Sequence, residues 1–161
     1  MSRKGIYTSK GYTSVDQAKN GGKVVLNSDP ANLARALQLL AQQGLITLKG
    51  GIDPLRVGTR DVAENPRKLR FVPVEAAQLP RTVGDATLAI VPGNYATAAG
   101  LDFTRALTLE KPPVAYQQVV AVRQANQNAP WAQDLKKAFR SEAFRQALDQ
   151  HFPGYVRPEG L

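Results

Sequence analysis

One stretch of the sequence places a guanidinium close to the expected start of a helix. Asp29 is a good N-cap, and Pro30 suits the first helical position, where its missing N–H costs nothing. Asn32 lies in the first turn and Arg35 follows it by three residues, so both side chains can share one helix face. Free N–H groups at a helix start and a guanidinium together form a site for a carboxylate or a phosphate. The alternative is an exposed arginine on the polar face of an amphipathic helix, and the local pattern leaves both readings open.

No other group of residues indicates catalysis or metal binding. The sequence has no cysteine and a single histidine, His151, which excludes thiolate nucleophiles, cysteine–zinc sites and histidine-rich metal sites. Asp85 and Asp102 have no evident carboxylate partner, and the glycine pairs at 21–22 and 50–51 lack the Lys-Ser/Thr of a phosphate loop. We therefore expect a protein that is not an enzyme and that has no catalytic residue, metal site or cofactor.

The elements that must position Arg35 alternate between strands and helices. Runs of β-branched and apolar residues predict strands at 23–26, 69–74, 85–91 and 119–122. Capping residues and helical spacing predict helices at 30–44, at 59–64, after 92–94, from Pro130 and from Ser141. This alternation predicts an α/β fold with a largely parallel sheet. Ligands bind beyond the carboxyl ends of strands in such sheets, and the junctions at 26–30 and 91–94 fit that description, which adds Asn94 to the candidates.

The net positive charge suggests nucleic-acid binding, but the distribution of the basic residues along the sequence does not support it. The 161 residues are 43% hydrophobic and carry a net charge of +8, enough apolar residues for one compact domain or a small two-lobed body. The densest basic group, between Arg56 and Arg70, is interrupted by Asp61 and Glu64. No zinc-finger spacing, aromatic RNA-binding motif or basic heptad is present. We expect no nucleic-acid partner and keep a basic nucleic-acid-binding domain as the least favoured alternative.

Several segments resemble, in the same order and spacing, the methionine-binding NlpA-type lipoproteins, which supply solute to ABC importers. The resemblance runs from Gly5 to about Gly154 and so covers nearly the whole chain. The segments that carry it are Gly5-Ile-Tyr-Thr-Ser-Lys10, Ser28-Asp-Pro-Ala-Asn32 with Arg35-Ala-Leu37, Gly44-Leu-Ile-Thr-Leu-Lys49, Asp61-Val-Ala-Glu-Asn-Pro66, Glu75-Ala-Ala-Gln-Leu-Pro-Arg81, Asn94-Tyr-Ala96 with Ala99-Gly-Leu101, and Tyr116-Gln-Gln-Val-Val-Ala-Val-Arg123.

The resemblance implies a type II periplasmic-binding-protein fold that closes around one amino acid between two lobes. Residues 1–124 would form one complete α/β lobe with hinge segments, and 125–161 would be C-terminal helices of an incomplete second lobe. Arg35 would pair with the carboxylate of a methionine-like ligand, in agreement with the anion site argued from the residues. Arg81 would have a structural role. The implied partner is an ABC permease, and the implied location is the cell envelope or periplasm.

Two positions depart from the family pattern in ways that affect ligand binding. Family members carry asparagines where this chain has Pro92 and Gln118, and those asparagines help to hold the ligand. Pro92 has no side-chain donor and no backbone N–H, so one contact is lost. Gln118 keeps the amide, displaced by one methylene, and remains a candidate ligand residue. The departures favour weakened binding, and the runner-up is a degenerate, non-transporting member that acts as an interaction module.

The start of the chain also differs from that of full-length relatives, which begin with a signal peptide and a lipidated cysteine. Residues 1–5 are basic but no apolar stretch follows them, so this chain is expected to carry neither feature. We therefore expect a truncated form in which the C-terminal helices expose Trp131 and other apolar side chains. Self-association through that surface is a further expectation.

Overall fold

The chain divides into two units, which are described separately. The structure, a computed structural model, describes residues 2–113, 116 and 119–157. One compact unit runs from Lys4 to Glu110, and the other comprises the chain on either side of it. The sequence predicts a boundary at 124, which stays a prediction.

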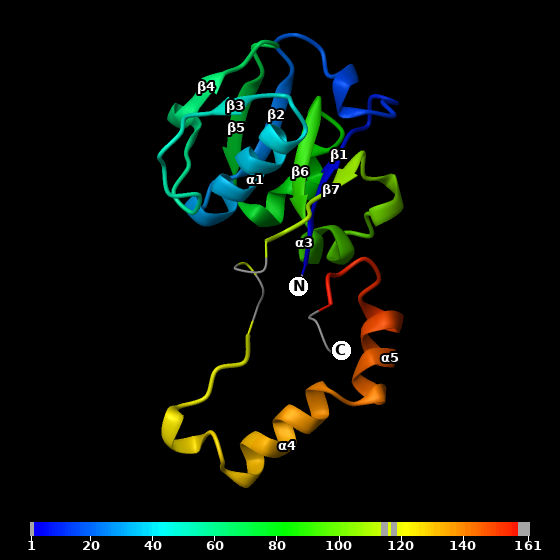
Figure 1. The fold of residues 1–161 in the computed structure, drawn as a ribbon. Helices are drawn as coiled ribbons and strands as arrows, with labels where there is room; N and C mark the ends of the chain where they lie inside the picture. Colours follow the sequence, from blue (N-terminus) through cyan, green and yellow to red (C-terminus); the bar gives the residue numbers. More distant parts are fainter. Residues whose placement is uncertain (1, 114–115, 117–118, 158–161) are drawn as a thin grey trace. The chain divides into compact units, whose positions relative to one another are not determined.

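A five-stranded sheet forms the centre of the unit that spans Lys4 to Glu110, with the strand order β5-β2-β6-β1-β7 (Figure 1). The strands are β1 (Lys4–Tyr7), β2 (Lys23–Asn27), β5 (Arg70–Val74), β6 (Leu88–Pro92) and β7 (Thr108–Leu109). β2 is parallel to β5 and to β6, whereas β1 is antiparallel to β6 and to β7. The α/β prediction is confirmed, but the sheet is mixed rather than largely parallel.

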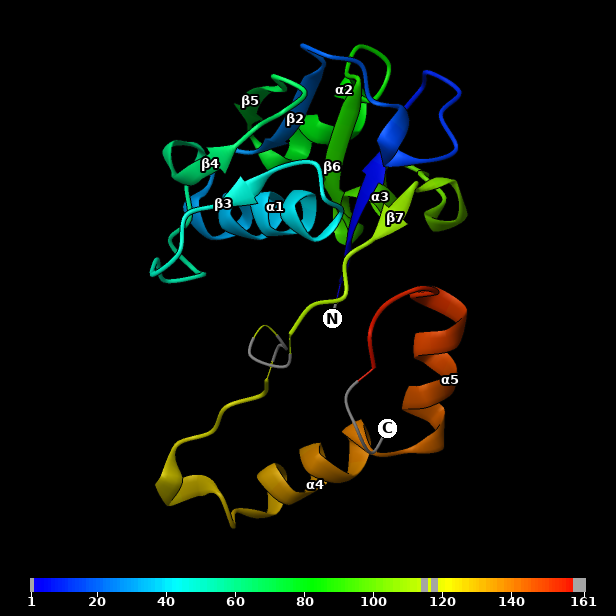
Figure 2. The same ribbon diagram turned by 45° about the horizontal axis from the view of Figure 1, so that its top comes forward.

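Both faces of this sheet are covered. Successive side chains of its buried strands point to opposite faces, and each face packs into its own apolar cluster. Val24 and Leu26 of β2 belong to the cluster that α1 (Pro30–Gln42) covers, while Val25 belongs to the opposite one. The opposite cluster is closed by α2 (Leu79–Thr82) and α3 (Gly93–Ala98). β3 (Thr47–Leu48) and β4 (Val62–Glu64) form a separate antiparallel ribbon, which lies beside α1 in Figure 2.

The predicted helix from Pro30 is confirmed, and its ends form as the residue types require. The Asp29 carboxylate accepts a hydrogen bond from the Asn32 N–H at 3.0 Å. Gly44 follows the helix with φ of +72°, a conformation that favours glycine. The predicted helices after 92–94, from Pro130 and from Ser141 are also confirmed.

Two predicted elements are wrong. Residues 59–64 form only a 3-10 turn at Thr59–Asp61, because Asp61 turns back to accept a bond from the Gly58 N–H at 2.8 Å and Val62–Glu64 then pairs with β3. Val119–Val122 is not a strand: Val119 is 83% exposed and Val120 is 56% exposed. A β-branched run favours an extended backbone, but a strand also needs a neighbouring strand to pair with. The sheet ends at β5 on one side and at β7 on the other, and Val119–Val122 pairs with neither.

The regular elements in the described part of the unit that contains the C-terminal residues are helices. It includes α4 (Pro130–Phe139) and α5 (Glu142–His151), joined at Ser141, whose hydroxyl caps α5 by accepting from the Phe144 N–H at 3.1 Å. Phe139 and Phe144 meet edge to face, with ring centroids 4.9 Å apart. Trp131 is 52% exposed and Phe139 is 37% exposed. Among the helices of the described residues, none has both the length and the apolar character to cross a bilayer.

The packing of Gly5 yields a prediction about the central sheet. A Cβ at Gly5 would lie 2.6 Å from Cε2 of Tyr7, and that ring is buried and cannot move aside. Gly5→Ala should therefore lower the free energy of unfolding by about 1–3 kcal/mol, measured by urea denaturation. Gly50→Ala is the control, since a Cβ there meets nothing within 4 Å. Equal stability of the two variants would contradict this packing.

Candidate functional site

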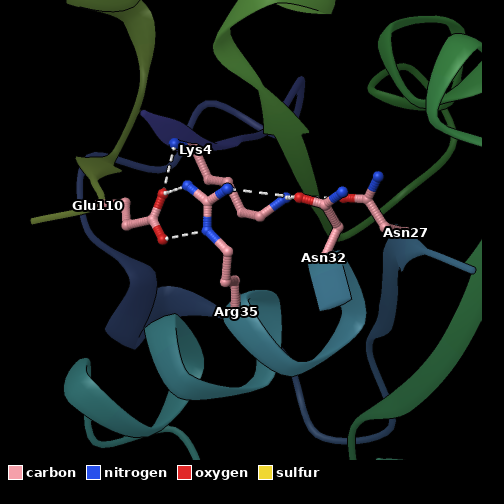
Figure 3. A network of polar contacts seen from close by, with 5 residues as sticks. All are labelled: Lys4, Asn27, Asn32, Arg35 and Glu110. Atoms are coloured by element: carbon pink, nitrogen blue, oxygen red, sulfur yellow. Dashed lines mark hydrogen bonds and ion pairs between the residues drawn. The ribbon is translucent and has the colours of Figure 1, made fainter. Parts of the chain in front are cut away.

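The mixed sheet gathers polar residues from distant parts of the chain at one edge. β2 and β6 end there, and each leads into a helix, α1 or α3. β1 starts at the same edge, because it is antiparallel to β6 with Lys4 opposite Pro92. β7 ends there too, with Glu110 as the next residue. Two candidates, Asn32 and Arg35, therefore meet three residues that the sequence did not single out, namely Lys4, Asn27 and Glu110 (Figure 3).

Arg35 is held by Glu110 in a two-pronged ion pair. Its Nε donates to Oε1 at 2.9 Å, and its Nη2 donates to Oε2 at 2.6 Å. The side chains of Arg35 and Glu110 are 15% and 6% exposed, so the alternative of an exposed surface arginine is wrong. Nη1 lies 3.5 Å from Oδ1 of Asn32, a long contact. The guanidinium thus has an internal carboxylate on one side and the start of α1 on the other.

The start of α1 is less open to an anion than the sequence predicts. The Asp29 carboxylate accepts from both the backbone N–H and the side-chain Nδ2 of Asn32, at 3.0 and 2.9 Å. Pro30 has no N–H, and the Leu33 N–H is bonded to the Asp29 carbonyl at 2.8 Å. The N-cap therefore satisfies donors that a ligand carboxylate would otherwise use, and any affinity for a carboxylate depends more on Arg35 than on the helix end.

Lys4 is the unexpected member of the site, because it is buried with 0% exposure. Its Nζ donates to Oδ1 of Asn27 at 3.0 Å and to Oδ1 of Asn32 at 2.9 Å. Two further hydrogen bonds join the backbone of Lys4 to Glu110. The Lys4 N–H donates to Oε2 of Glu110 at 3.0 Å, and the Lys4 carbonyl accepts from the Glu110 N–H at 2.7 Å. Burial, followed by the nearby Arg35 charge, lowers the pKa of Lys4 to about 7 against the opposing effects of Glu110 and Asp29.

Two buried polar atoms, one on β2 and one on β1, have no hydrogen-bond partner among the residues that the structure describes. Nδ2 of Asn27 is one of them, because only the oxygen of that amide is used, by Lys4. The Tyr7 hydroxyl is the other, and burial raises the pKa of that phenol to about 12. Asn27 stands where β2 leads into α1, so its unused donor belongs to the same edge of the sheet as Arg35.

The remaining candidates are not part of this cluster in the described residues. Asn94 is exposed in the first turn of α3. Gln118 lies outside the described residues. Pro92 is buried at the end of β6, where it offers no donor. Arg81 is exposed in α2, and the structural role implied for it stays a prediction.

Solved structures similar to this chain share its fold over almost its whole length. A nutrient-binding protein from Burkholderia cenocepacia, solved with methionine bound, is 37% identical to this chain with a TM-score of 0.84. The match covers 96% of this chain and 65% of that protein. A periplasmic substrate-binding protein of an ABC transporter from Coxiella burnetii is 42% identical with a TM-score of 0.81, covering 93% and 63%. The fold is thus that of a periplasmic binding protein, and the predicted type II lobe is confirmed.

The family pattern of the NlpA lipoproteins matches residues 2–160, and the chain belongs to this family. Among characterised relatives, the probable D-methionine-binding lipoprotein MetQ of Vibrio cholerae is 35% identical over 92% of this chain. The match covers 57% of that protein, so the chain spans a little over half the length of this relative. The resemblance inferred from the ordered motifs is therefore confirmed.

The Arg35–Glu110 pair yields a prediction about stability. Glu110→Gln keeps the shape of the side chain but leaves the guanidinium without its carboxylate, and breaking a largely buried pair in this way should cost about 2–4 kcal/mol of unfolding free energy. The matched control is Asp134→Asn, which breaks the exposed Asp134–Lys137 pair and should cost under about 1 kcal/mol. Denaturant unfolding of both variants checks this. Equal costs would mean that Arg35 and Glu110 do not form a buried pair.

Proposed function

We propose that this chain is the solute-binding component, in whole or in part, of an ABC importer for methionine or a related amino acid. The observation that carries the proposal is the match, at 37% identity and a TM-score of 0.84, to a protein solved with methionine bound. The chain spans only part of its relatives' length, so the ligand and the permease partner are inferences from the family. Family membership likewise supports a binding protein of the cell envelope rather than an enzyme.

The head-group site of this proposal is the cluster around Arg35. The Arg35 side chain is 15% exposed, and charge-assisted bonds between a guanidinium and a carboxylate are strong. The incoming carboxylate would share the guanidinium with Glu110, on the side where Asn32 already approaches Nη1 at 3.5 Å. Asn94 and Gln118 remain proposed ligand residues on the strength of the sequence.

A degenerate member that acts as an interaction module is the second candidate, and one observation favours it. Arg35 is already bonded through two nitrogens to Glu110, and Pro92 supplies no donor at the end of β6. A ligand must then compete with an internal carboxylate. Titration with methionine decides between the two candidates, because only a binding protein gives saturable heat.

The proposal predicts a specific effect of removing the guanidinium. Arg35→Ala should weaken methionine binding by about tenfold or more, since one charge-assisted bond is worth at least about 1.4 kcal/mol. Calorimetric titration with D-methionine and L-methionine measures this. Arg81→Ala is the control, because that exposed arginine lies outside the cluster and its removal should leave affinity unchanged.

Methioninamide provides the ligand-side test, since it lacks the negative charge and should bind the parent protein poorly. If Arg35→Ala binds methionine and methioninamide with the same affinities as the parent protein, the carboxylate assignment is wrong.

Self-association is a separate proposal, supported by the apolar surface of the C-terminal helices. Trp131 and Phe152 are 52% and 45% exposed, and Phe139 is 37% exposed. We expect sedimentation to show a larger species at high concentration, and Trp131→Ser to reduce it. A clean monomer throughout the concentration range would contradict this.

A further inference from the structure

Lys4 and Arg35 put an amine and a guanidinium beside one buried carboxylate. Glu110 is that carboxylate, and it bonds both the Arg35 guanidinium and the Lys4 backbone N–H. The other acidic group that faces Lys4 is Asp29, which is exposed and bonded to Asn32, so water screens its charge. β6 contributes only Pro92 opposite Lys4, and β2 contributes the neutral Asn27. With Lys4 protonated, the buried part of the cluster therefore carries two positive charges and one negative charge.

The hydrogen bonds of Lys4 suit either protonation state. A neutral amine has two N–H groups, and Nζ has two acceptors in the structure, the amide oxygens of Asn27 and Asn32. An ammonium has a third N–H, for which no acceptor occurs among the described contacts of Lys4. Protonation therefore changes the charge of the site without breaking a bond. Burial and the neighbouring Arg35 bring the pKa of this amine to about 7, so both states are available near neutrality.

We propose that Lys4 is a positioning residue of the Arg35 site that takes up a proton when a ligand carboxylate binds there. This rests on the proposed function. Lys4 acts without touching the ligand, because its Nζ holds the same Oδ1 of Asn32 that Arg35 Nη1 approaches. A carboxylate placed on Arg35 favours the ammonium form of Lys4, and the proton comes from solvent. The site is then specific for anionic head groups and is coupled to pH.

The sign of the coupling follows from linkage. The ligand-bound state has the higher Lys4 pKa, so binding is tightest below about pH 7 and weakens as pH rises through the pKa of the bound state. A ligand that raises this pKa from about 7 to about 8 would take up about half a proton at pH 7.5. It would bind roughly five- to tenfold more weakly at pH 8.5 than at pH 6.

Calorimetry of methionine binding in phosphate and in Tris at pH 7.5 tests this on the full chain, because the buffers differ in ionisation enthalpy. For the parent, the difference in heat should report uptake of a fraction of a proton. Lys4→Arg keeps the charge but does not titrate, so it should bind without buffer dependence and with a flat pH profile between 6 and 8.5. Lys4→Met should also lose the buffer dependence and should bind more weakly at pH 6. Lys10→Met, which removes an exposed lysine, should behave as the parent does.

A ligand-free measurement covers the case in which a variant folds poorly. Because folding depresses the pKa of Lys4, the parent should gain stability as pH rises from about 7 towards 10.5, and Lys4→Met should lack that gain. Methionine binding with no proton uptake, or with uptake unchanged in Lys4→Arg, overturns this inference alone. The absence of any methionine heat from the parent overturns the proposed function and this inference with it.

Discussion

The pairing of Glu110 with Arg35 and with the backbone of Lys4 is the interaction on which this edge of the structure depends. Glu110 follows β7, Lys4 begins β1, and Arg35 stands on α1, so one carboxylate joins elements that are distant in the sequence. Buried charges persist only when partnered, and here each cation is satisfied by a group that another element supplies. Loss of the carboxylate would leave a guanidinium and a buried amine side by side without the acidic group that joins them, which is strongly destabilising.

The features predicted from the sequence are those with a strong local cause. The helix from Pro30 has an acidic N-cap, a proline in its first turn and a glycine beyond its end, and all three act as their chemistry requires. Strand β2 is a β-branched run that the core covers on both faces. Arg35 was found because it shares a helix face with Asn32, although its partner was expected to be a ligand and in the structure is Glu110.

The features that were missed have no local cause. β1 and β7 are four and two residues long, too short for a periodic pattern, and they exist because neighbouring strands complete them. Lys4 reads as part of a basic N-terminus, and nothing in the sequence near it signals burial. The rule that sites lie at the carboxyl ends of strands could have identified Asn27, which ends β2. The opposite error occurred at Val119–Val122, where a favourable local pattern finds no neighbouring strand.

The position of Lys4 and Glu110 has a topological consequence. These residues are the first and the last of the larger compact unit, and the Lys4 carbonyl accepts the Glu110 N–H at 2.7 Å. A segment whose ends lie one hydrogen bond apart has the geometry of an inserted module, in which the chain enters and leaves at a single place. Such a module can in principle be transferred between hosts, or its ends joined and new ends opened in an exposed loop such as that around Gly50.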